Sequence, residues 1–84
     1  MSLSRYAKKR DAIEPFVIGV ARRKGWLVIQ HDKYDLELFR NGVRIMAEVK
    51  SGQKALTPRQ QALIDEGWPL VVIRSVEEAE ALLA

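Results

Sequence analysis

Three charged residues near the middle of the chain have the types and spacing that metal-assisted hydrolysis of a phosphate ester needs. Asp35 lies in one alternating segment, and Glu48 and Lys50 lie two residues apart in the next. Carboxylate oxygens bind hard cations such as Mg²⁺ or Mn²⁺, which keep several waters and take one or two carboxylates plus substrate phosphate. A lysine beside a metal-bound water can stabilise the attacking hydroxide or the charge that develops on phosphate. These three residues are therefore the first candidates for a catalytic site.

The two alternating segments are expected to pair and bring these residues together. Residues 34–40 (YDLELFR) and 43–50 (VRIMAEVK) are joined by Asn41-Gly42, the strongest short-range signal for a hairpin. A two-residue turn sets the register and places Asp35 opposite Glu48, with Cβ atoms about 4.5–5.5 Å apart. Two carboxylates in that position repel each other, and a divalent cation between them removes the repulsion.

The two faces of this hairpin differ in character. Lys50 follows Glu48 by two residues, so it lies on the same face as the carboxylates. The alternative is that Lys50 only forms a cross-strand ion pair with one of them, worth about 0.2–1 kcal/mol if exposed. The opposite face carries the apolar side chains of a core-facing surface: Leu36, Leu38, Val43, Ile45, Ala47 and Val49.

Before the hairpin, the sequence predicts a helix and a short strand. Apolar residues recur at three- and four-residue steps through residues 6–24, and Gly25 suits a left-handed helix end. Pro15 predicts either a kink or a helix that begins nearer Glu14. Residues 26–30 (WLVIQ) form a β-branched apolar run that is typical of a strand.

After the hairpin, the pattern predicts helix, strand, helix. Thr57 is an expected N-cap for a helix that runs to about Glu66, and residues 70–74 (LVVIR) resemble a strand buried on both faces. Ser75 is the expected N-cap of a last helix. The whole order predicts an α/β domain with a mixed central sheet and flanking helices. One face of the last helix carries Val76, Ala79, Leu82 and Leu83.

Length, composition and charge narrow the class of protein to which the chain can belong. The 84 residues, 48% of them hydrophobic, suit a single folded domain, 1–84, and without cysteine nothing indicates an oxidising compartment. No apolar stretch at the N-terminus is long enough for a signal peptide or membrane span, so we expect a cytoplasmic protein. The net charge of +3 favours a polyanionic partner, or it only aids solubility. Half of the 14 basic residues lie before Leu27: Arg5, Lys8, Lys9, Arg10, Arg22, Arg23 and Lys24.

The order of these residues resembles the virus-type replication-repair nuclease (VRR-NUC) family. Asp35 is followed by Glu48-Val49-Lys50, a Ser-Gly loop and residues 56–60 (LTPRQ) at a helix start. The resemblance covers most of the chain, and a phage or mobile-element origin fits it. Such proteins belong to the PD-(D/E)xK superfamily and cleave DNA with Mg²⁺ or Mn²⁺. In place of the family's usual Gly-x-Pro-Asp turn stands 32–35 (DKYD), so we expect an altered local backbone and unchanged chemistry.

The resemblance assigns roles to the residues of the hairpin. It implies that Asp35 and Glu48 are metal ligands, with the backbone carbonyl of Val49 as a third, and that Lys50 positions or polarises the attacking water. If the hairpin slipped register, Asp32 would take the place of Asp35.

Outside the hairpin, the resemblance points to two further residues. Gln60 matches the family's motif glutamine better than Gln61, because the spacing from the Thr-Pro pair selects it. Glu14 resembles an acidic residue that completes the site from the first helix, although Asp11, one helical turn earlier, could take this role or Glu14 could be only a surface charge.

The expected partner is DNA, with no organic cofactor and no membrane. Phosphate contacts, which position a substrate without reading its sequence, are expected from Lys8, Lys9, Arg10, Lys54 and Arg59. Relatives akin to Holliday junction resolvases imply a homodimer that acts on branched DNA. The alternatives are a nucleic-acid-binding module without catalysis, whose binding depends steeply on salt and needs no metal, and a structural dimerisation domain.

Three other side chains allow a functional reading beside a structural one. His31 is the only histidine and could act as a general base, but a polar loop between strands is an ordinary place for it. Trp26 and Trp68 could stack on bases, but a domain this small needs its large apolar side chains for packing.

Overall fold

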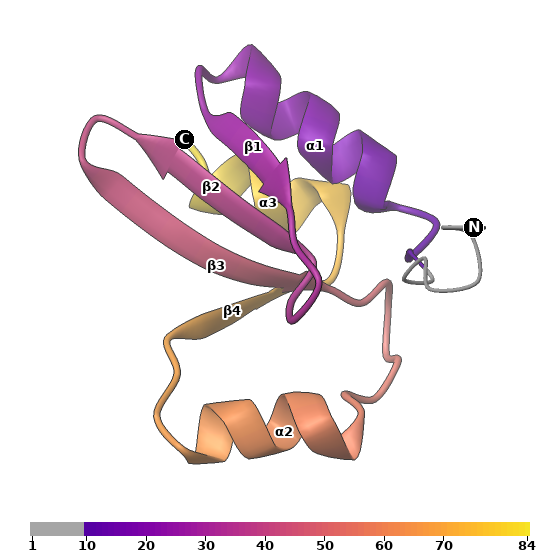
Figure 1. Cartoon of the computed structure of the whole chain (residues 1–84). Coiled ribbons are helices and arrows are strands. Elements are labelled where there is room, and N and C mark those ends of the chain that lie inside the picture. The colour runs from indigo at the N-terminus through magenta and orange to yellow at the C-terminus, as the bar shows by residue number, and fades with distance from the viewer. Residues whose placement is uncertain (1–9) are drawn as a thin grey trace, which may run out of the picture.

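A four-stranded sheet in the order β1-β2-β3-β4 organises the chain (Figure 1). The computed structural model describes residues 10–84. The first three strands are antiparallel neighbours, and β4 lies parallel to β3, so the predicted mixed sheet is confirmed. The strands are β1 (Leu27–Gln30), β2 (Leu36–Arg40), β3 (Val43–Val49) and β4 (Leu70–Ile73).

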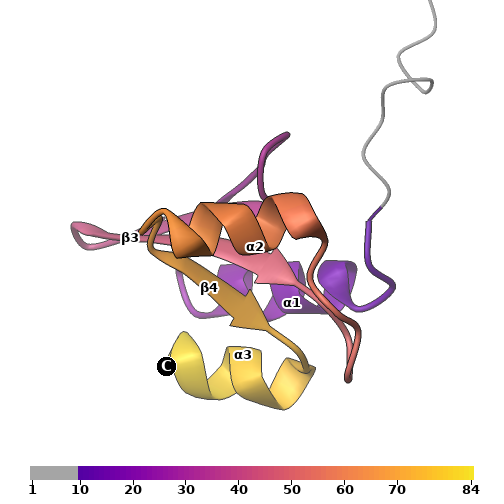
Figure 2. The same cartoon turned by 90° about the horizontal axis from the view of Figure 1, so that it is seen from below.

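Three helices complete the predicted order of elements: α1 (Glu14–Arg23), α2 (Pro58–Asp65) and α3 (Val76–Leu82). α1 and α3 lie together on one side of the sheet, whereas α2 stands apart beyond β4 (Figures 1 and 2). α2 provides the crossover that a parallel strand pair requires, yet none of its residues is buried. No helix in residues 10–84 is long and apolar enough to cross a membrane.

The position of α2 corrects one prediction about burial. β4 was expected to be buried on both faces, but Ile73 alone of its residues is buried. β4 is an edge strand, and α2 does not close over it (Figure 1). The apolar face expected for α3 is also incomplete, because Leu82 is exposed while Ala79 and Leu83 are buried.

The hairpin turn forms as predicted. Asn41 and Gly42 both have positive φ, 51° and 80°, which a type I′ turn requires. The turn pairs Arg40 with Val43 and fixes the register of β2 against β3 as expected. The paired strands are described from Leu36, so Asp35 stands one residue before β2. The described pairs end at Leu36 with Ala47, and the Asp35 backbone N–H also donates to the carbonyl of Ala47, so the expected pairing of Asp35 with Glu48 is not among them.

α1 begins at Glu14, and Pro15 sits in its first turn, where a missing N–H costs no helix hydrogen bond. The second of the two alternatives for Pro15 is therefore confirmed, and residues 6–9 of the predicted helix lie outside the described part. Gly25 has φ 87° and ends the helix as expected.

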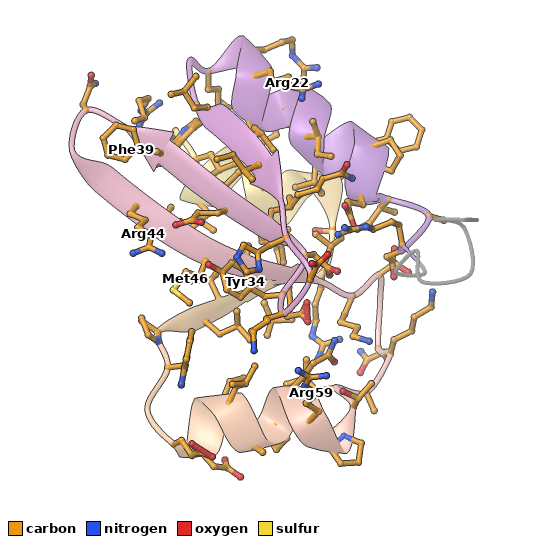
Figure 3. The ribbon with its side chains drawn as sticks, in the orientation of Figure 1. Arg22, Tyr34, Phe39, Arg44, Met46 and Arg59 are labelled. Atoms are coloured by element: carbon orange, nitrogen blue, oxygen red, sulfur yellow. The ribbon has the colours of Figure 1, made fainter. Side chains whose placement is uncertain are left out.

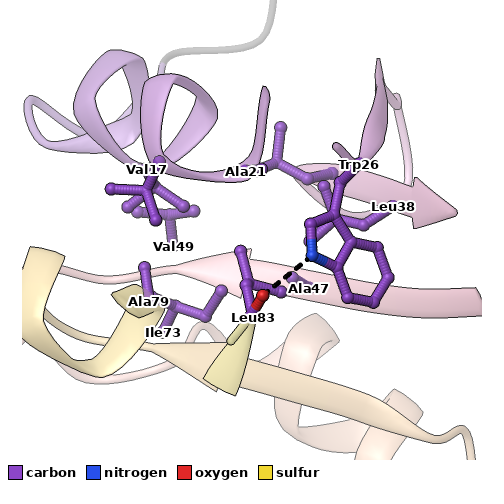
Figure 4. Packing of buried hydrophobic residues seen from close by; sticks show 11 residues of the cluster. Val17, Ala21, Trp26, Leu38, Ala47, Val49, Ile73, Ala79 and Leu83 are labelled. Atoms are coloured by element: carbon purple, nitrogen blue, oxygen red, sulfur yellow. Dashed lines mark hydrogen bonds between the residues drawn. The ribbon is translucent and has the colours of Figure 1, made fainter. Parts of the chain in front are cut away.

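The core lies between the sheet and the α1–α3 layer (Figure 4). Trp26 belongs to this core and connects it to the last residues of the chain, because its Nε1 donates to the carbonyl of Leu83 at 3.0 Å. The Arg40 guanidinium covers the Trp26 ring at 4.4 Å from the centroid. Its Nη1 also donates to the carbonyl of Lys24 at 2.9 Å, so one side chain ties β2 to the end of α1. The buried cluster comprises Val17, Val20, Ala21, Trp26, Leu36, Leu38, Ala47, Val49, Ile73, Ala79 and Leu83.

Candidate active site

A pocket of about 250 Å³ opens where the start of α1, the end of β3 and the start of α2 meet. It brings together side chains from five separate segments of sequence. Of the predicted catalytic and metal-binding residues, four line it, whereas Glu48 and Glu14 do not. The lining residues are Arg10, Asp11, Asp35, Val49, Lys50, Lys54 and Gln60.

Asp35 is buried at the edge of this pocket, and several contacts fix its position. Its Oδ2 accepts a hydrogen bond from the backbone N–H of Val49 at 2.7 Å. The backbone N–H of Asp35 donates to the carbonyl of Ala47 at 3.1 Å, which attaches this residue to β3. Asp32 is exposed and does not line the pocket, so the slipped register that would have exchanged the two residues does not occur.

Arg10 holds Asp35 from the other side. Its Nη1 donates to the carbonyl of Asp35 at 3.0 Å and lies 3.7 Å from the carboxylate Oδ1. Its Nη2 donates to the carbonyl of His31 at 3.3 Å. The sequence predicted that Arg10 contacts DNA phosphate, but in the structure its guanidinium bonds two backbone carbonyls of the loop 31–35, which carries Asp35. No local pattern indicates this, because the partners lie more than 20 residues away in sequence.

Glu48 is completely buried, and Gln60 separates it from the pocket. The Oε2 of Glu48 accepts a hydrogen bond from Gln60 Nε2 at 2.5 Å. Gln60 Oε1 accepts from the Thr57 backbone N–H at 2.8 Å, and Thr57 Oγ1 accepts from the Gln60 N–H at 3.2 Å. This capping box confirms Thr57 as the N-cap and turns the amide nitrogen of Gln60 towards Glu48. The start of α2 is thereby attached to β3.

Replacing Gln60 by Ala is expected to lower the free energy of unfolding by about 1–3 kcal/mol, because the Thr57 backbone N–H loses its acceptor and the buried carboxylate of Glu48 loses a donor. The neighbouring Gln61 is the matched control: it is exposed, and its side chain donates to Asp65 within α2, so Gln61→Ala should cost about 0.5 kcal/mol or less. Urea denaturation of both variants measures the difference. Equal losses would contradict the role given to Gln60.

Lys50 directly follows β3 and lines the pocket. Its backbone N–H donates to the carbonyl of Ile73 at 3.0 Å, which fixes the position of its Cα. Among residues 10–84, the ion pairs do not include one with Lys50. The cross-strand ion pair considered as the alternative is therefore not formed within the described part, and the ammonium group is available to a ligand in the pocket.

The two acidic candidates near α1 occupy different places. Glu14 is buried, does not line the pocket, and its Oε2 accepts from Gln30 Nε2 at 2.9 Å and faces Arg10 Nη1 at 3.4 Å. The surface-charge reading of Glu14 is therefore wrong. Asp11 does line the pocket, and its Oδ2 accepts from the backbone N–H of Ser51 at 3.0 Å. Asp11 thus ties the start of α1 to the loop that follows β3.

The Asp11 carboxyl has a low pKa. Burial alone would raise it, but the N–H groups of Ile13 and Ser51, the Lys54 ammonium and the Ser51 hydroxyl together lower this pKa from 3.8 to about 2. Because the folded-state pKa lies below the unfolded one, the carboxylate stabilises the folded protein at pH values above the unfolded pKa of 3.8. This contribution is lost as pH falls through 3.8 towards 2.

Asp11→Asn is therefore expected to destabilise the protein at pH 6 and to approach the wild type as pH falls towards 2. Thermal denaturation from pH 6 down to pH 2 measures the convergence. The exposed Asp32→Asn should follow the wild type throughout. A constant gap between the wild type and Asp11→Asn over this range would contradict the assignment.

The other residues expected to contact phosphate differ in what the structure says of them. Lys8 and Lys9 lie outside the described residues. Lys54 Nζ donates to Asp11 Oδ2 at 3.3 Å, yet its side chain is largely exposed beside the pocket. Arg59 is exposed near the start of α2 (Figure 3).

His31 does not line the pocket. Its ring stacks on Tyr34 with centroids 4.3 Å apart, and its Nδ1 accepts from the Lys33 N–H at 3.2 Å. These contacts shape the 31–35 loop that carries Asp35, in the segment where the expected proline is absent. The structural reading of His31 therefore fits its position better than a role as general base.

The oxygen atoms near the pocket suit a hard cation, but the residues predicted to bind it include only two carboxylates. No group of three or more His, Asp or Glu side chains in residues 10–84 is arranged to hold a metal ion. Mg²⁺ nevertheless binds commonly through one or two carboxylates, with water and substrate phosphate supplying the other oxygens. The carboxylates of Asp35 and Glu48 and the carbonyl of Val49 are oxygen donors of this kind. Asp35 and Val49 line the pocket, and Glu48 lies behind Gln60.

Comparison of the chain with family models, with curated proteins and with solved structures gave no match.

Proposed function

We propose that this chain is a small PD-(D/E)xK nuclease of the VRR-NUC type that hydrolyses phosphodiester bonds in DNA with Mg²⁺ or Mn²⁺. One observation carries the proposal. A pocket open to solvent contains the Asp35 carboxylate and Lys50, which forms no ion pair with any described residue, and the fully buried Glu48 is held by a residue of its wall. A buried carboxylate and a nearby lysine at a pocket are costly to maintain, which favours a functional reason for them.

The proposed roles follow from the contacts of each residue. Asp35 is held by Val49 and Arg10, so its carboxylate is pre-oriented for a cation. Glu48 is the second carboxylate, and the Gln60 amide holds its Oε2. A bound Mg²⁺ or Mn²⁺ would supply a nucleophilic water and neutralise phosphate charge. Lys50 then stabilises negative charge on the attacking oxygen or on the phosphate.

The substrate proposed is DNA with a branch, bound through its phosphates. Lys54 lines the pocket, and Arg59 precedes Gln60 in the chain; both carry exposed cationic side chains, which would position a DNA backbone without reading bases. A lone domain of this size offers little surface to grip a duplex, so we propose that two copies act together, each with one pocket.

Cleavage of labelled four-way-junction, flap and linear duplex DNA, each with Mn²⁺, Mg²⁺ or EDTA, tests the proposal. We expect cutting with either metal, none with EDTA, and the fastest cutting on the junction. Binding of all three DNAs without cutting under any condition would refute the nuclease and leave a binding module, which needs no metal and depends steeply on salt.

A further inference from the structure

Two buried carboxylates near the pocket lie against the same cationic side chain. Arg10 Nη1 is 3.4 Å from Glu14 Oε2 and 3.7 Å from Asp35 Oδ1. Both acidic residues are buried, so water screens their charges poorly. Carboxylates that approach the same point repel each other, and a cation between them removes the repulsion. In this protein that cation is a guanidinium of the chain itself.

The Arg10 guanidinium is fixed in this position by further hydrogen bonds. Its Nη1 donates to the carbonyl of Asp35 at 3.0 Å, and its Nη2 donates to the carbonyl of His31 at 3.3 Å. The planar fork of an arginine loses less side-chain freedom for each bond than a lysine does. Glu14 is held as well, because Gln30 Nε2 donates to its Oε2 at 2.9 Å. A metal ion between Glu14 and Asp35 would have to displace Arg10 from these bonds.

Asp11, the other acidic residue at the start of α1, is also neutralised within the protein. Its Oδ2 accepts from Lys54 Nζ at 3.3 Å and from the backbone N–H and the hydroxyl of Ser51 at 3.0 and 3.1 Å. Its Oδ1 accepts from the Ile13 N–H at 3.0 Å. Asp11 therefore has a cationic partner in the chain, as Glu14 does, and both of its oxygens accept hydrogen bonds.

The charges at the pocket suit one divalent cation. Among residues 10–84, the charged side chains that line the pocket or bond a lining side chain are four acids and three bases: Asp11, Glu14, Asp35, Glu48, Arg10, Lys50 and Lys54. Counted as ionised, they leave a net charge of minus one. One divalent cation reverses this to plus one, which a single phosphodiester group balances. A second divalent cation, about 3.5–4 Å from the first, would leave an excess of positive charge.

We propose that Arg10 takes the place of a second metal ion, so that each chain binds one Mg²⁺ or Mn²⁺, at Asp35 and Glu48. Glu14 then serves Arg10 and does not bind the metal, because it orients the guanidinium that holds Asp35. Arg10 is a positioning residue, since it acts on the metal site through Asp35. The inference rests on the proposed function, and it adds the number of metal ions and the residue that limits this number.

Counting bound Mn²⁺ in the absence of DNA tests the inference. A titration in which electron paramagnetic resonance measures free Mn²⁺ is expected to give one bound ion for each wild-type chain. Arg10→Met should bind two, because Glu14 and Asp35 no longer have the guanidinium between them and carboxylates bind this ion. Arg10→Lys keeps a positive charge and should bind one. Arg22→Met is the matched control: Arg22 is exposed on α1 and does not line the pocket, so this variant should also bind one (Figure 3).

Two variants of Glu14 test its role separately. Glu14→Gln has nearly the same shape and should bind one Mn²⁺ with an affinity within about fivefold of the wild type, because Glu14 does not bind the ion. The double variant Arg10→Met/Glu14→Gln should bind one ion where Arg10→Met binds two, because a carboxylate is lost together with the guanidinium. Circular dichroism melts show which variants fold, and Glu14→Gln decides the question if Arg10→Met does not fold.

Two Mn²⁺ ions on the wild-type chain would overturn the inference. So would a folded Arg10→Met variant that binds only one, or a loss of Mn²⁺ affinity of about tenfold or more in Glu14→Gln. Each of these outcomes leaves the nuclease proposal standing, because cleavage is measured separately. A wild type that binds no Mn²⁺ would refute the metal-dependent nuclease and this inference with it, whereas failed cleavage by a wild type that binds one ion would refute the nuclease alone.

Discussion

Lys50→Met is expected to reduce metal-dependent DNA cleavage by at least about 100-fold, because loss of a single group that stabilises developing charge commonly costs that much. Lys50 forms no ion pair among the described residues, so the substitution removes an ammonium from the pocket without breaking a structural contact of the side chain. Stability should therefore change little. Single-turnover cleavage of the preferred DNA measures the effect, and thermal denaturation measures the stability.

The matched control is Lys24→Met at the other end of α1. Lys24 pairs with Glu80 on the surface, and loss of such a pair costs about 0–1 kcal/mol, so cleavage should stay near the wild-type rate. Similar rates for Lys50→Met and the wild type would contradict the role of Lys50 even if the wild type proves to be a nuclease.

Comparing Asp35→Asn with Lys50→Met distinguishes a residue that binds the metal from one that assists only the chemical step. A carboxylate that binds Mn²⁺ contributes to affinity in the absence of DNA, whereas a lysine does not. Isothermal titration of Mn²⁺ should show weaker binding to Asp35→Asn and an unchanged or tighter affinity for Lys50→Met. Equal Mn²⁺ affinities for the wild type and Asp35→Asn would remove Asp35 from the metal site.

Trp26→Ala is expected to lower the free energy of unfolding by about 3–5 kcal/mol, the usual cost of truncating a large buried aromatic side chain. Trp26 is buried between the end of α1 and the end of α3, its Nε1 donates to Leu83, and Arg40 covers its ring. A domain of this size has a small margin of stability, so this variant should be largely unfolded at 37 °C. Urea denaturation followed by circular dichroism measures the loss.

Trp68→Ala provides the comparison, because the same residue type is substantially exposed at position 68. We expect a loss of about 1 kcal/mol or less there. Trp26→Phe keeps one aromatic ring but loses the second ring of the indole together with its N–H, so its destabilisation should lie between those of the two alanine variants. If Trp26→Ala and Trp68→Ala were equally destabilising, the core position assigned to Trp26 would be wrong.

The two tryptophans show how far composition alone can predict burial. Both were expected to serve packing, and the sequence gives no reason to separate them. Trp26 follows the glycine that ends α1 and turns into the core, whereas Trp68 follows α2, which is itself unburied. Burial of a residue depends on which element closes over it.

Local signals were sufficient for most of the fold. The Asn41-Gly42 turn specified both the hairpin and its register, since only residues that tolerate positive φ form this turn, and a register shift by one residue would expose the apolar face. Thr57 and Ser75 marked two helix starts for a similar reason, because each cap involves a residue only three positions away.

The sequence by itself therefore determined the elements, the pairing of β2 with β3 and the line of side chains that includes Glu48 and Lys50. These features depend on contacts between near neighbours and on a period of two. Only the tertiary structure decided that Arg10 holds Asp35, that Asp11 ties α1 to Ser51, and that Gln60 stands between Glu48 and the pocket. Each of these contacts joins segments 12 to 40 residues apart, and no local propensity encodes which distant donor meets which acceptor.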